Sequence, residues 1–375
     1  MTSEWNHFAL GEITELVIDY RGKTPKKLGG DWCKQGYRAL SAKNIKTGRI
    51  VQAETIRYID ESLYRKWMKD EVQRGDILIT SEAPFGQIFF WDSDEKIVLS
   101  QRLFCVRIKP EYDARFIYYY MTTTEFQSEL DGRATGTTVI GLRQPELMKC
   151  VIRCPEIQEQ KVIAAILSSI DAKIIANEKV NDNLQQQAQA IYSSMFIDNP
   201  DPAWSHGHLS DLITVKYGKD HKKLADGIYP VYGSGGIMRY VERPLYNKES
   251  VLIPRKGTLN NVMYVNQPFW SVDTMFYTEM KLPNVAKFVY HFVKAKDLAS
   301  MNAGSAVPSM TTDILNAMEV VIPSASALEE FESLVAPMYE AMEANDVQSK
   351  ALSQIRDTLL PKLMSGEIDV SDVQL

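Results

Sequence analysis

Two stretches of the chain combine Lys and Arg with Gly, small polar residues and aromatic residues: residues 20–46 and residues 216–261. Lys and Arg neutralise phosphates, glycines allow a backbone to approach closely, and Ser, Thr, Asn and Arg hydrogen-bond to base edges. The pattern therefore predicts nucleic-acid contacts, with ordinary solvent-exposed turns as the alternative. The candidate DNA-binding residues are Arg21, Lys23, Thr24, Lys26, Lys27, Lys43, Asn44, Lys219, His221, Lys222, Lys223, Ser234, Arg239, Arg255, Lys256, Thr258 and Asn260.

The sequence does not match the motifs for catalysis or metal binding that we considered. Gly22-Lys23-Thr24 resembles the end of a phosphate-binding loop, but that pattern needs a glycine where Val17 stands. The five histidines lack metal-ligand spacing. Cys150 and Cys154 have no second pair that would complete a zinc site, and are expected to be buried. We therefore expect no metal, no cofactor and no catalytic residue in this chain.

The charge of the chain is unevenly distributed. A net charge of −6 over 375 residues argues against general polyanion binding. Residues 20–49, however, hold nine Lys or Arg and one acid, whereas residues 324–349 hold six acids and no Lys or Arg. The two segments are expected to meet different partners. No apolar run approaches the ~20 residues of a membrane span, and no signal-peptide pattern opens the sequence, which predicts a cytoplasmic protein without membrane contact.

The two halves of the sequence align as an internal repeat. The difference in residue number between matched segments decreases steadily along the chain, from 199 to 168, as expected if the second copy has lost loop segments. Similar basic loops then recur at matching places in both copies. The matched pairs are Leu10-Gly-Glu-Ile with Leu209-Ser-Asp-Leu, Gly36-Tyr-Arg-Ala-Leu with Gly227-Ile-Tyr-Pro-Val, Asp76-Ile-Leu-Ile with Ser250-Val-Leu-Ile, Gly136-Thr-Thr-Val-Ile-Gly-Leu with Gly304-Ser-Ala-Val-Pro-Ser-Met, and Pro155 with Pro323.

Each copy begins with short apolar runs broken by Gly, Pro and polar clusters. These runs predict strands over residues 72–80, 86–91, 103–108, 250–254, 262–265 and 275–280. Residues 116–130 and 286–298 read as helices. Each copy is therefore expected to form a mixed α+β globule.

Each copy ends in a long helix. Residues 156–196 repeat apolar residues, among them Ile163, Val180 and Met195, at a period near 3.5 to 3.6. Residues 324–364 follow the same period, and prolines predict a kink near 337 and an end near 361. Asn177 and Asn345 take the same heptad position in the two helices. A buried asparagine there fixes the register of a coiled coil, and chance occurrence in two polar patches is the alternative.

A helix of 40 residues is ~60 Å long and cannot bury its apolar stripe against one small globule. We therefore expect two similar α+β domains separated by two long antiparallel helices that form a coiled coil, related by a pseudo-twofold internal repeat. The expected domains are residues 1–155 (first recognition domain), 156–197 (central helix), 198–323 (second recognition domain) and 324–375 (distal helix and tail).

This plan resembles the specificity subunit of type I restriction-modification enzymes over nearly the whole chain. The resemblance rests on the duplicated domain-plus-helix arrangement and on particular motifs. These are Tyr20-Arg-Gly-Lys-Thr-Pro, Tyr229-Pro-Val-Tyr-Gly-Ser-Gly-Gly, Leu252-Ile-Pro-Arg-Lys-Gly, Pro155-Glu-Ile-Gln-Glu-Gln-Lys-Val-Ile and Leu359-Leu-Pro-Lys-Leu-Met-Ser-Gly-Glu-Ile.

The resemblance implies a non-catalytic subunit that binds double-stranded DNA. Each globule would read half of a bipartite target, and the coiled coil would set the gap and dock two methyltransferase subunits. S-adenosylmethionine, ATP and Mg²⁺ would belong to those partners and to restriction subunits. The alternative is a coiled-coil interaction scaffold that does not bind DNA, which the acidic segment 324–349 and the negative net charge favour.

Overall fold

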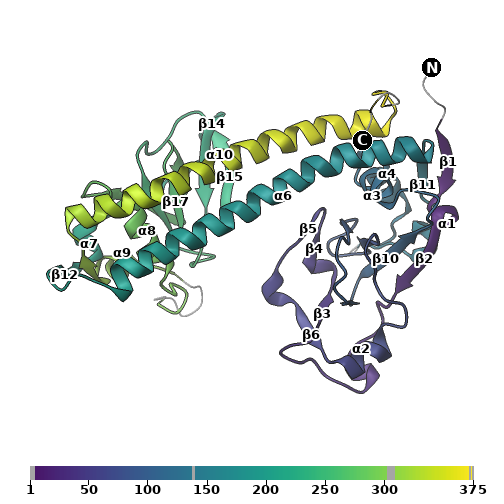
Figure 1. The fold of residues 1–375 in the computed structure, drawn as a ribbon, viewed down its shortest axis with the longest axis horizontal. Coiled ribbons are helices and arrows are strands. Elements are labelled where there is room, and N and C mark those ends of the chain that lie inside the picture. Colours follow the sequence, from purple (N-terminus) through teal and green to yellow (C-terminus); the bar gives the residue numbers. More distant parts are fainter. Residues whose placement is uncertain (1–4, 137–139, 302–308, 371–372, 374–375) are drawn as a thin grey trace. The chain divides into compact units, whose positions relative to one another are not determined.

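A computed structural model describes residues 5–136, 140–301, 309–370 and 373 (Figure 1). Contacts divide the chain into unit 1, residues 1–176 with 348–375, and unit 2, residues 177–347. Each unit holds one α+β head, here head 1 (residues 5–154) and head 2 (residues 205–322). Each unit also holds part of two long helices, α6 (Ile157–Ser193) and α10 (Ala325–Met364).

Head 1 is built on a four-stranded antiparallel sheet in the order β2-β10-β7-β8. A second sheet, β6-β3-β9, pairs β3 with β6 antiparallel and with β9 parallel, and β1 pairs with β11. The strands are β1 (Asn6–Ala9), β2 (Thr14–Asp19), β3 (Tyr37–Leu40), β6 (Arg57–Ile59), β7 (Ile77–Thr80), β8 (Ile88–Phe90), β9 (Ile97–Leu99), β10 (Leu103–Ile108) and β11 (Val151–Cys154).

Head 2 repeats this topology strand for strand. Its sheets run β13-β19-β16-β17 and β15-β14-β18, and β12 pairs with β20. The predicted mixed α+β repeat is therefore confirmed, although its matches at residues 137–139 and 304–308 lie outside the described residues. The strands are β12 (Ser205–His208), β13 (Ile213–Tyr217), β14 (Asp226–Gly233), β15 (Gly236–Val241), β16 (Ser250–Pro254), β17 (Met263–Val265), β18 (Trp270–Ser271), β19 (Met275–Met280) and β20 (Glu319–Ile322).

The short helices also correspond, with additions in head 1. Three pairs match: α1 (Leu10–Ile13) with α7 (Leu209–Leu212), α3 (Ala114–Met121) with α8 (Ala286–Lys294), and α5 (Gln144–Leu147) with α9 (Thr312–Asn316). The described part of head 2 has no counterpart to the hairpin β4–β5 (Ile45–Lys46, Arg49–Ile50), α2 (Glu61–Trp67) or α4 (Thr124–Arg133). These additions account for the later part of the decrease in residue-number difference between the copies, from 191 to 168.

The single helix predicted over residues 116–130 is wrong. It is two helices, α3 and α4, because Thr123 begins a new one. The Thr123 hydroxyl accepts a hydrogen bond from the Phe126 amide at 3.3 Å, which caps the N-terminus of α4. The chain therefore turns between the two helices, and α3 presents Phe116 and Tyr120 to the core of head 1.

The two long helices run antiparallel to each other within each unit. In unit 1, Arg356 of α10 bonds to Asp171 of α6 at 2.8 Å. In unit 2, Asn177 is 1% exposed and its Nδ2 donates to the Asn345 carbonyl at 3.4 Å. Asn345 Nδ2 donates to Asn181 Oδ1 at 2.8 Å. Both predicted asparagines therefore lie where α6 and α10 meet, and their role in register stays a prediction.

One detail of the predicted helices is wrong. Val180 is 48% exposed, because Asn177 and Asn181 occupy the contact line instead. The helix α10 continues through Pro337, which lies on the exposed side, where water can satisfy the carbonyl left without an amide donor, and the kink there stays a prediction. The end predicted near residue 361 is confirmed, since Pro361 lies in the last turn and α10 ends at Met364.

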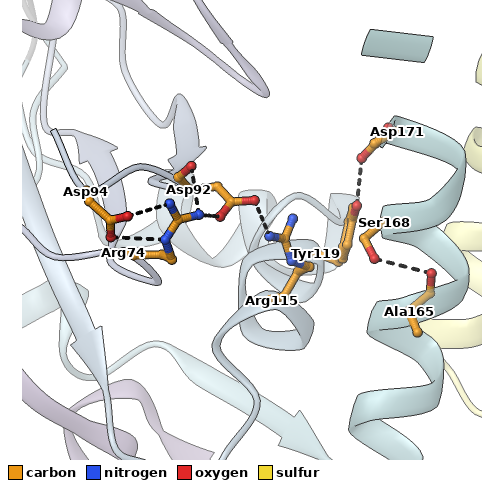
Figure 2. A network of polar contacts seen from close by, with 8 residues as sticks. All are labelled: Arg74, Asp92, Asp94, Arg115, Tyr119, Ala165, Ser168 and Asp171. Atoms are coloured by element: carbon orange, nitrogen blue, oxygen red, sulfur yellow. Dashed lines mark hydrogen bonds and ion pairs between the residues drawn. The ribbon is translucent and has the colours of Figure 1, made fainter. Parts of the chain in front are cut away.

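Polar contacts fix head 1 to the helices of unit 1. Tyr119 on α3 donates to Asp171 at 2.7 Å, and one turn earlier Arg115 bonds to Asp92 at 2.7 Å (Figure 2). Asp92 also accepts from Arg74, which pairs with Asp94. The apolar layer beneath is formed by the sheet, α3 and the helix residues Ile163 and Leu167.

Head 2 is fixed to the helices of unit 2 by a buried histidine on α8. His291 is 0% exposed, its Nδ1 lies 2.8 Å from Gln189 Oε1 on α6, and its Nε2 lies 2.9 Å from the Tyr339 hydroxyl on α10. An amide oxygen only accepts, so the Nδ1–H of His291 donates to Gln189 and Nε2 accepts from Tyr339. Burial lowers the pKa of His291 to about 4, so the ring is neutral at neutral pH.

Acidification should therefore destabilise unit 2. The pKa of His291 is 6.5 in its ordinary state and about 4 when folded, so the unfolded chain takes up this proton first. The stabilisation is complete above pH 6.5 and is lost progressively as the pH falls to 4, by about 3 kcal/mol. Urea unfolding at a series of pH values measures it. His291→Gln should remove this slope and the exposed His206→Gln should keep it; equal slopes would contradict the assignment.

Candidate nucleic-acid interface

Strand register brings distant loops to one edge of each sheet. In head 1, Asp19 at the end of β2 pairs with Phe104, and Thr80 at the end of β7 pairs with Leu103 at the start of β10. In head 2, Tyr217 pairs with Phe276 and Pro254 with Met275. The loops after β2 and β7, and their counterparts after β13 and β16, therefore emerge beside the loop that precedes β10 or β19.

A further loop joins each edge through the second sheet. Leu40 at the end of β3 pairs with Leu99, and the Ala42 amide donates to the Gln101 carbonyl at 3.1 Å. In head 2, Tyr232 pairs with Ser271 and accepts from the Val272 amide at 3.1 Å. We call these clusters loop edge 1, residues 20–28, 41–44, 81–86 and 100–102, and loop edge 2, residues 218–225, 233–236, 255–261 and 272–274.

The sequence-predicted residues gather at these two edges. Arg239 on β15 is the exception among the seventeen candidates. Most of the lysines point into solvent, where they can meet phosphates. The exposed candidates are Lys26, Lys27, Lys43, Lys219, Lys222, Lys223, Lys256, Thr258 and Asn260. Thr24, His221, Ser234 and Arg255 are half-buried at the same edges.

Some predicted cations are held by partners within the heads. Arg21 makes two hydrogen bonds of 2.8 Å to Asp19 and lies 4.0 Å above the Phe104 ring. Lys23 donates to the Trp67 carbonyl and lies 3.6 Å above the Tyr20 ring, and burial lowers its pKa. Arg239 donates to Asp226 at 2.7 Å. These side chains shape the loop edges, and a bound polyanion would have to compete with their present partners.

Two predicted asparagines, Asn44 and Asn260, hold loops together through hydrogen bonds of their side chains. Asn44 is 1% exposed; it accepts from the Ser41 amide at 3.1 Å and donates to the Thr55 hydroxyl at 3.0 Å. Asn260 donates to Asp297 at 2.9 Å and accepts from the Ala299 amide at 2.9 Å. We therefore assign both asparagines a structural part, because their side-chain amides already bond to groups within their own heads.

Sequence reasoning missed a cavity at loop edge 1. Its volume is about 280 Å³, and Trp32, Lys43, Arg57, Gln101 and Arg102 are among its lining residues. Arg57 lies far along the chain from the adjacent pair Gln101 and Arg102, and none of the three belongs to a basic run. Only the pairing of β3 with β6 and β9 brings them together, so no local sequence signal could have found them.

The described residues bear on two other kinds of site. Within them, no group of three or more His, Cys, Asp or Glu side chains lies close enough to hold a metal ion. No helix in the described ranges is both long and apolar enough to cross a bilayer. Cys105, Cys150 and Cys154 are buried as free thiols, and burial raises the pKa of Cys150 and Cys154 to about 12.

The chain is similar to known proteins over most of its length. The family model described as "Type I restriction modification DNA specificity domain" matches residues 2–186 and 203–331. The MjaIX specificity subunit of Methanocaldococcus jannaschii is 24% identical over 344 residues, covering 80% of this chain and 79% of the relative. The HindI specificity subunit of Haemophilus influenzae is 20% identical over 418 residues, covering 80% and 88%.

A solved structure shares the fold. The specificity subunit of a type I restriction-modification system from M. genitalium aligns over 96% of both chains with a TM-score of 0.61, at 19% sequence identity. The two matched family segments each contain one head, in agreement with the repeated topology.

The contrast between Asn44 and its neighbour Lys43 can be tested on the free protein. Asn44→Ala removes a buried side-chain amide that accepts from the Ser41 amide and donates to the Thr55 hydroxyl, so the free energy of unfolding should fall by about 1–3 kcal/mol. Lys43→Ala removes an exposed side chain and should change it by less than about 0.5 kcal/mol. Chemical denaturation measures both values. Equal stabilities for the two variants would contradict the structural part assigned to Asn44.

Proposed function

The chain belongs to the family of type I restriction-modification DNA specificity subunits, and from that premise we propose that each head reads one half of a bipartite DNA target. The observation that carries this proposal is the equivalence of the two loop edges. Both are assembled by the same strand register, and both present exposed cations beside glycines and small polar residues. Such a surface positions a protein on phosphates and offers side chains to base edges.

Each edge combines two kinds of contact in this proposal. Exposed lysines such as Lys26, Lys222 and Lys223 supply the salt-dependent attraction to phosphates, which is the same for every sequence. Side chains recessed among them supply the preference for particular bases. With two edges on one chain, binding of the first half-site makes engagement of the second intramolecular.

We further propose that catalysis belongs to partner subunits. The chain would act without metal or cofactor of its own, in the cytoplasm, with two methyltransferase subunits that use S-adenosylmethionine. Restriction subunits that use ATP and Mg²⁺ would be a further partner. Exposed apolar side chains on α6 and α10 support docking by such partners: Ile175, Leu334, Val347 and Ile355 are 47%, 46%, 61% and 49% exposed.

The acidic segment favours a second candidate, an interaction scaffold that does not bind DNA. Five of its six acids are exposed on α10 and would repel phosphates. The sixth, Glu332, is paired at 2.6 Å with Lys287, which is 4% exposed. Glu332 therefore stabilises the fold, and only the five exposed acids support the scaffold hypothesis. The following charge test separates the scaffold from the DNA-reading function.

Removing cations from loop edge 2 should weaken binding to duplex DNA and flatten the dependence of that binding on salt. The variants are Lys222→Ala with Lys223→Ala, and Arg255→Ala with Lys256→Ala, made in the full chain co-expressed with its methyltransferase subunit. Each lost phosphate contact should reduce the slope of log K against log salt by about 0.9. Fluorescence anisotropy at several salt concentrations measures it.

The matched control is Lys179→Ala, an exposed cation on α6 outside both loop edges. It should leave both the affinity and the salt slope unchanged. If both loop-edge variants also bound as the unmodified chain does, the DNA-reading proposal would fail and the scaffold would remain.

The length of the helix pair should set the gap between the half-sites. We predict that seven residues inserted after Val180 in α6, together with seven after Glu343 in α10, keep the heptad register and lengthen both helices by about 10 Å. That length corresponds to roughly three base pairs. Selection of bound duplexes from a randomised library, followed by sequencing, should show a longer gap between two unchanged half-sites. Altered half-site sequences would contradict the idea.

A further inference from the structure

The cavity at loop edge 1 has the character of a recognition pocket. Its volume of about 280 Å³ lies near the lower limit for small-ligand sites, so it admits part of one nucleotide and no duplex. Its wall offers many hydrogen-bond donors: the cations Lys43, Arg57 and Arg102, and the amide of Gln101. A wall of this kind complements the edge of a base that carries acceptors.

Arg102 is held in an orientation that leaves part of its guanidinium available. Its Nε lies 3.0 Å from Glu82 Oε1, while its side chain is still 48% exposed. The Arg102 backbone has φ 63°, a left-handed conformation that residues other than glycine rarely adopt, and its carbonyl accepts a hydrogen bond from the Ser81 amide at 2.9 Å. Such strain persists where surrounding structure imposes it, which is common at ligand sites.

The guanidinium of Arg57 is also available, unlike that of its counterpart in head 2. Register equates the two, because Arg57 pairs with Ala39 of β3, and Arg239 pairs with Val231 of β14. Arg239 is held by the Asp226 carboxylate and the Leu224 carbonyl at 2.7 and 3.0 Å. Arg57 instead is exposed and lies over the Trp32 ring, with 5.3 Å between guanidinium and ring centroid. Its donors therefore face the cavity without a carboxylate in competition.

We propose that Arg57 and Arg102 determine base preference in head 1 by hydrogen-bonding to the acceptor edge of a guanine placed at this cavity. The proposal rests on the proposed function, since it names the residues that give one loop edge its selectivity. Arginine presents two parallel donors that match O6 and N7 of guanine, the pair of acceptors in the major groove that adenine, thymine and cytosine lack. Glu82 is a positioning residue that orients Arg102.

The arrangement is confined to head 1. Thr80 and Leu103 correspond by register to Pro254 and Met275, so Glu82 corresponds to Lys256 and Arg102 to Thr274. Head 2 thus replaces the acid of the Arg102–Glu82 pair by a base and the arginine by a threonine. The two heads should therefore prefer different half-sites, and the guanine contact should be found in one of them only.

The test is selection from a randomised duplex library by the full chain with its co-expressed partner subunits, followed by sequencing of the bound DNA. Arg102→Gly suits the left-handed backbone and so preserves the loop, and Arg57→Ala removes an exposed side chain. Each should lower the preference for guanine at one position of one half-site by roughly 5- to 100-fold. The other half-site should be unchanged. Glu82→Gln should reduce the same preference, but less.

Lys26→Ala is the matched control, an exposed cation of the same loop edge outside the cavity. It should weaken binding equally for all sequences. If Arg57→Ala and Arg102→Gly behaved like Lys26→Ala, or left the selected sequences unchanged, the inference would be wrong while the proposed function stood. If the unmodified chain selected no sequence at all, the proposed function itself would fall.

Discussion

Both heads depend on one constraint, the antiparallel register that ends several strands at the same edge of a sheet. The pairings of Asp19 with Phe104 and of Thr80 with Leu103 are fixed by backbone hydrogen bonds and by the buried faces of β7 and β10. A slip of one residue would turn those apolar side chains to the opposite face, so the core enforces the register. The positions of the loops after β2 and β7 follow from it, and the parallel pairing of β3 with β9 adds the loop after β3 to the same edge.

The internal repeat and the long helices were predictable, because they depend on patterns that survive in a single sequence. Short apolar runs located β16 and β19 to the residue, and a period of 3.5 to 3.6 located both long helices. Their details were less predictable, since local side-chain chemistry decides them. A threonine cap divided one expected helix, and two asparagines displaced an expected apolar residue, Val180, from the line of contact between the long helices.

Residue type and spacing located the loop edges but did not separate free side chains from occupied ones. Asn44 and Lys43 are neighbours in the same polar run. Asn44 is nevertheless buried and bonds to a residue further along the chain, whereas Lys43 is exposed. Arg57 and Arg102 were missed for the opposite reason. Arg57 begins β6 and Arg102 precedes β10, neither has a basic neighbour to mark it, and only pairing between strands far apart in the sequence brings them to one cavity.

The separation of the loop edges from the cores has a consequence for evolution and for engineering. In both heads most of the large buried side chains belong to the sheets and helices, whereas the cationic side chains of the loop edges are mostly exposed. Substitutions at exposed loop positions cost little stability, so recognition can diverge while the scaffold stays intact. The exchange of Glu82 for Lys256 within one duplicated framework is such a divergence. Grafting loops between heads is therefore a rational way to build chains with new DNA specificities.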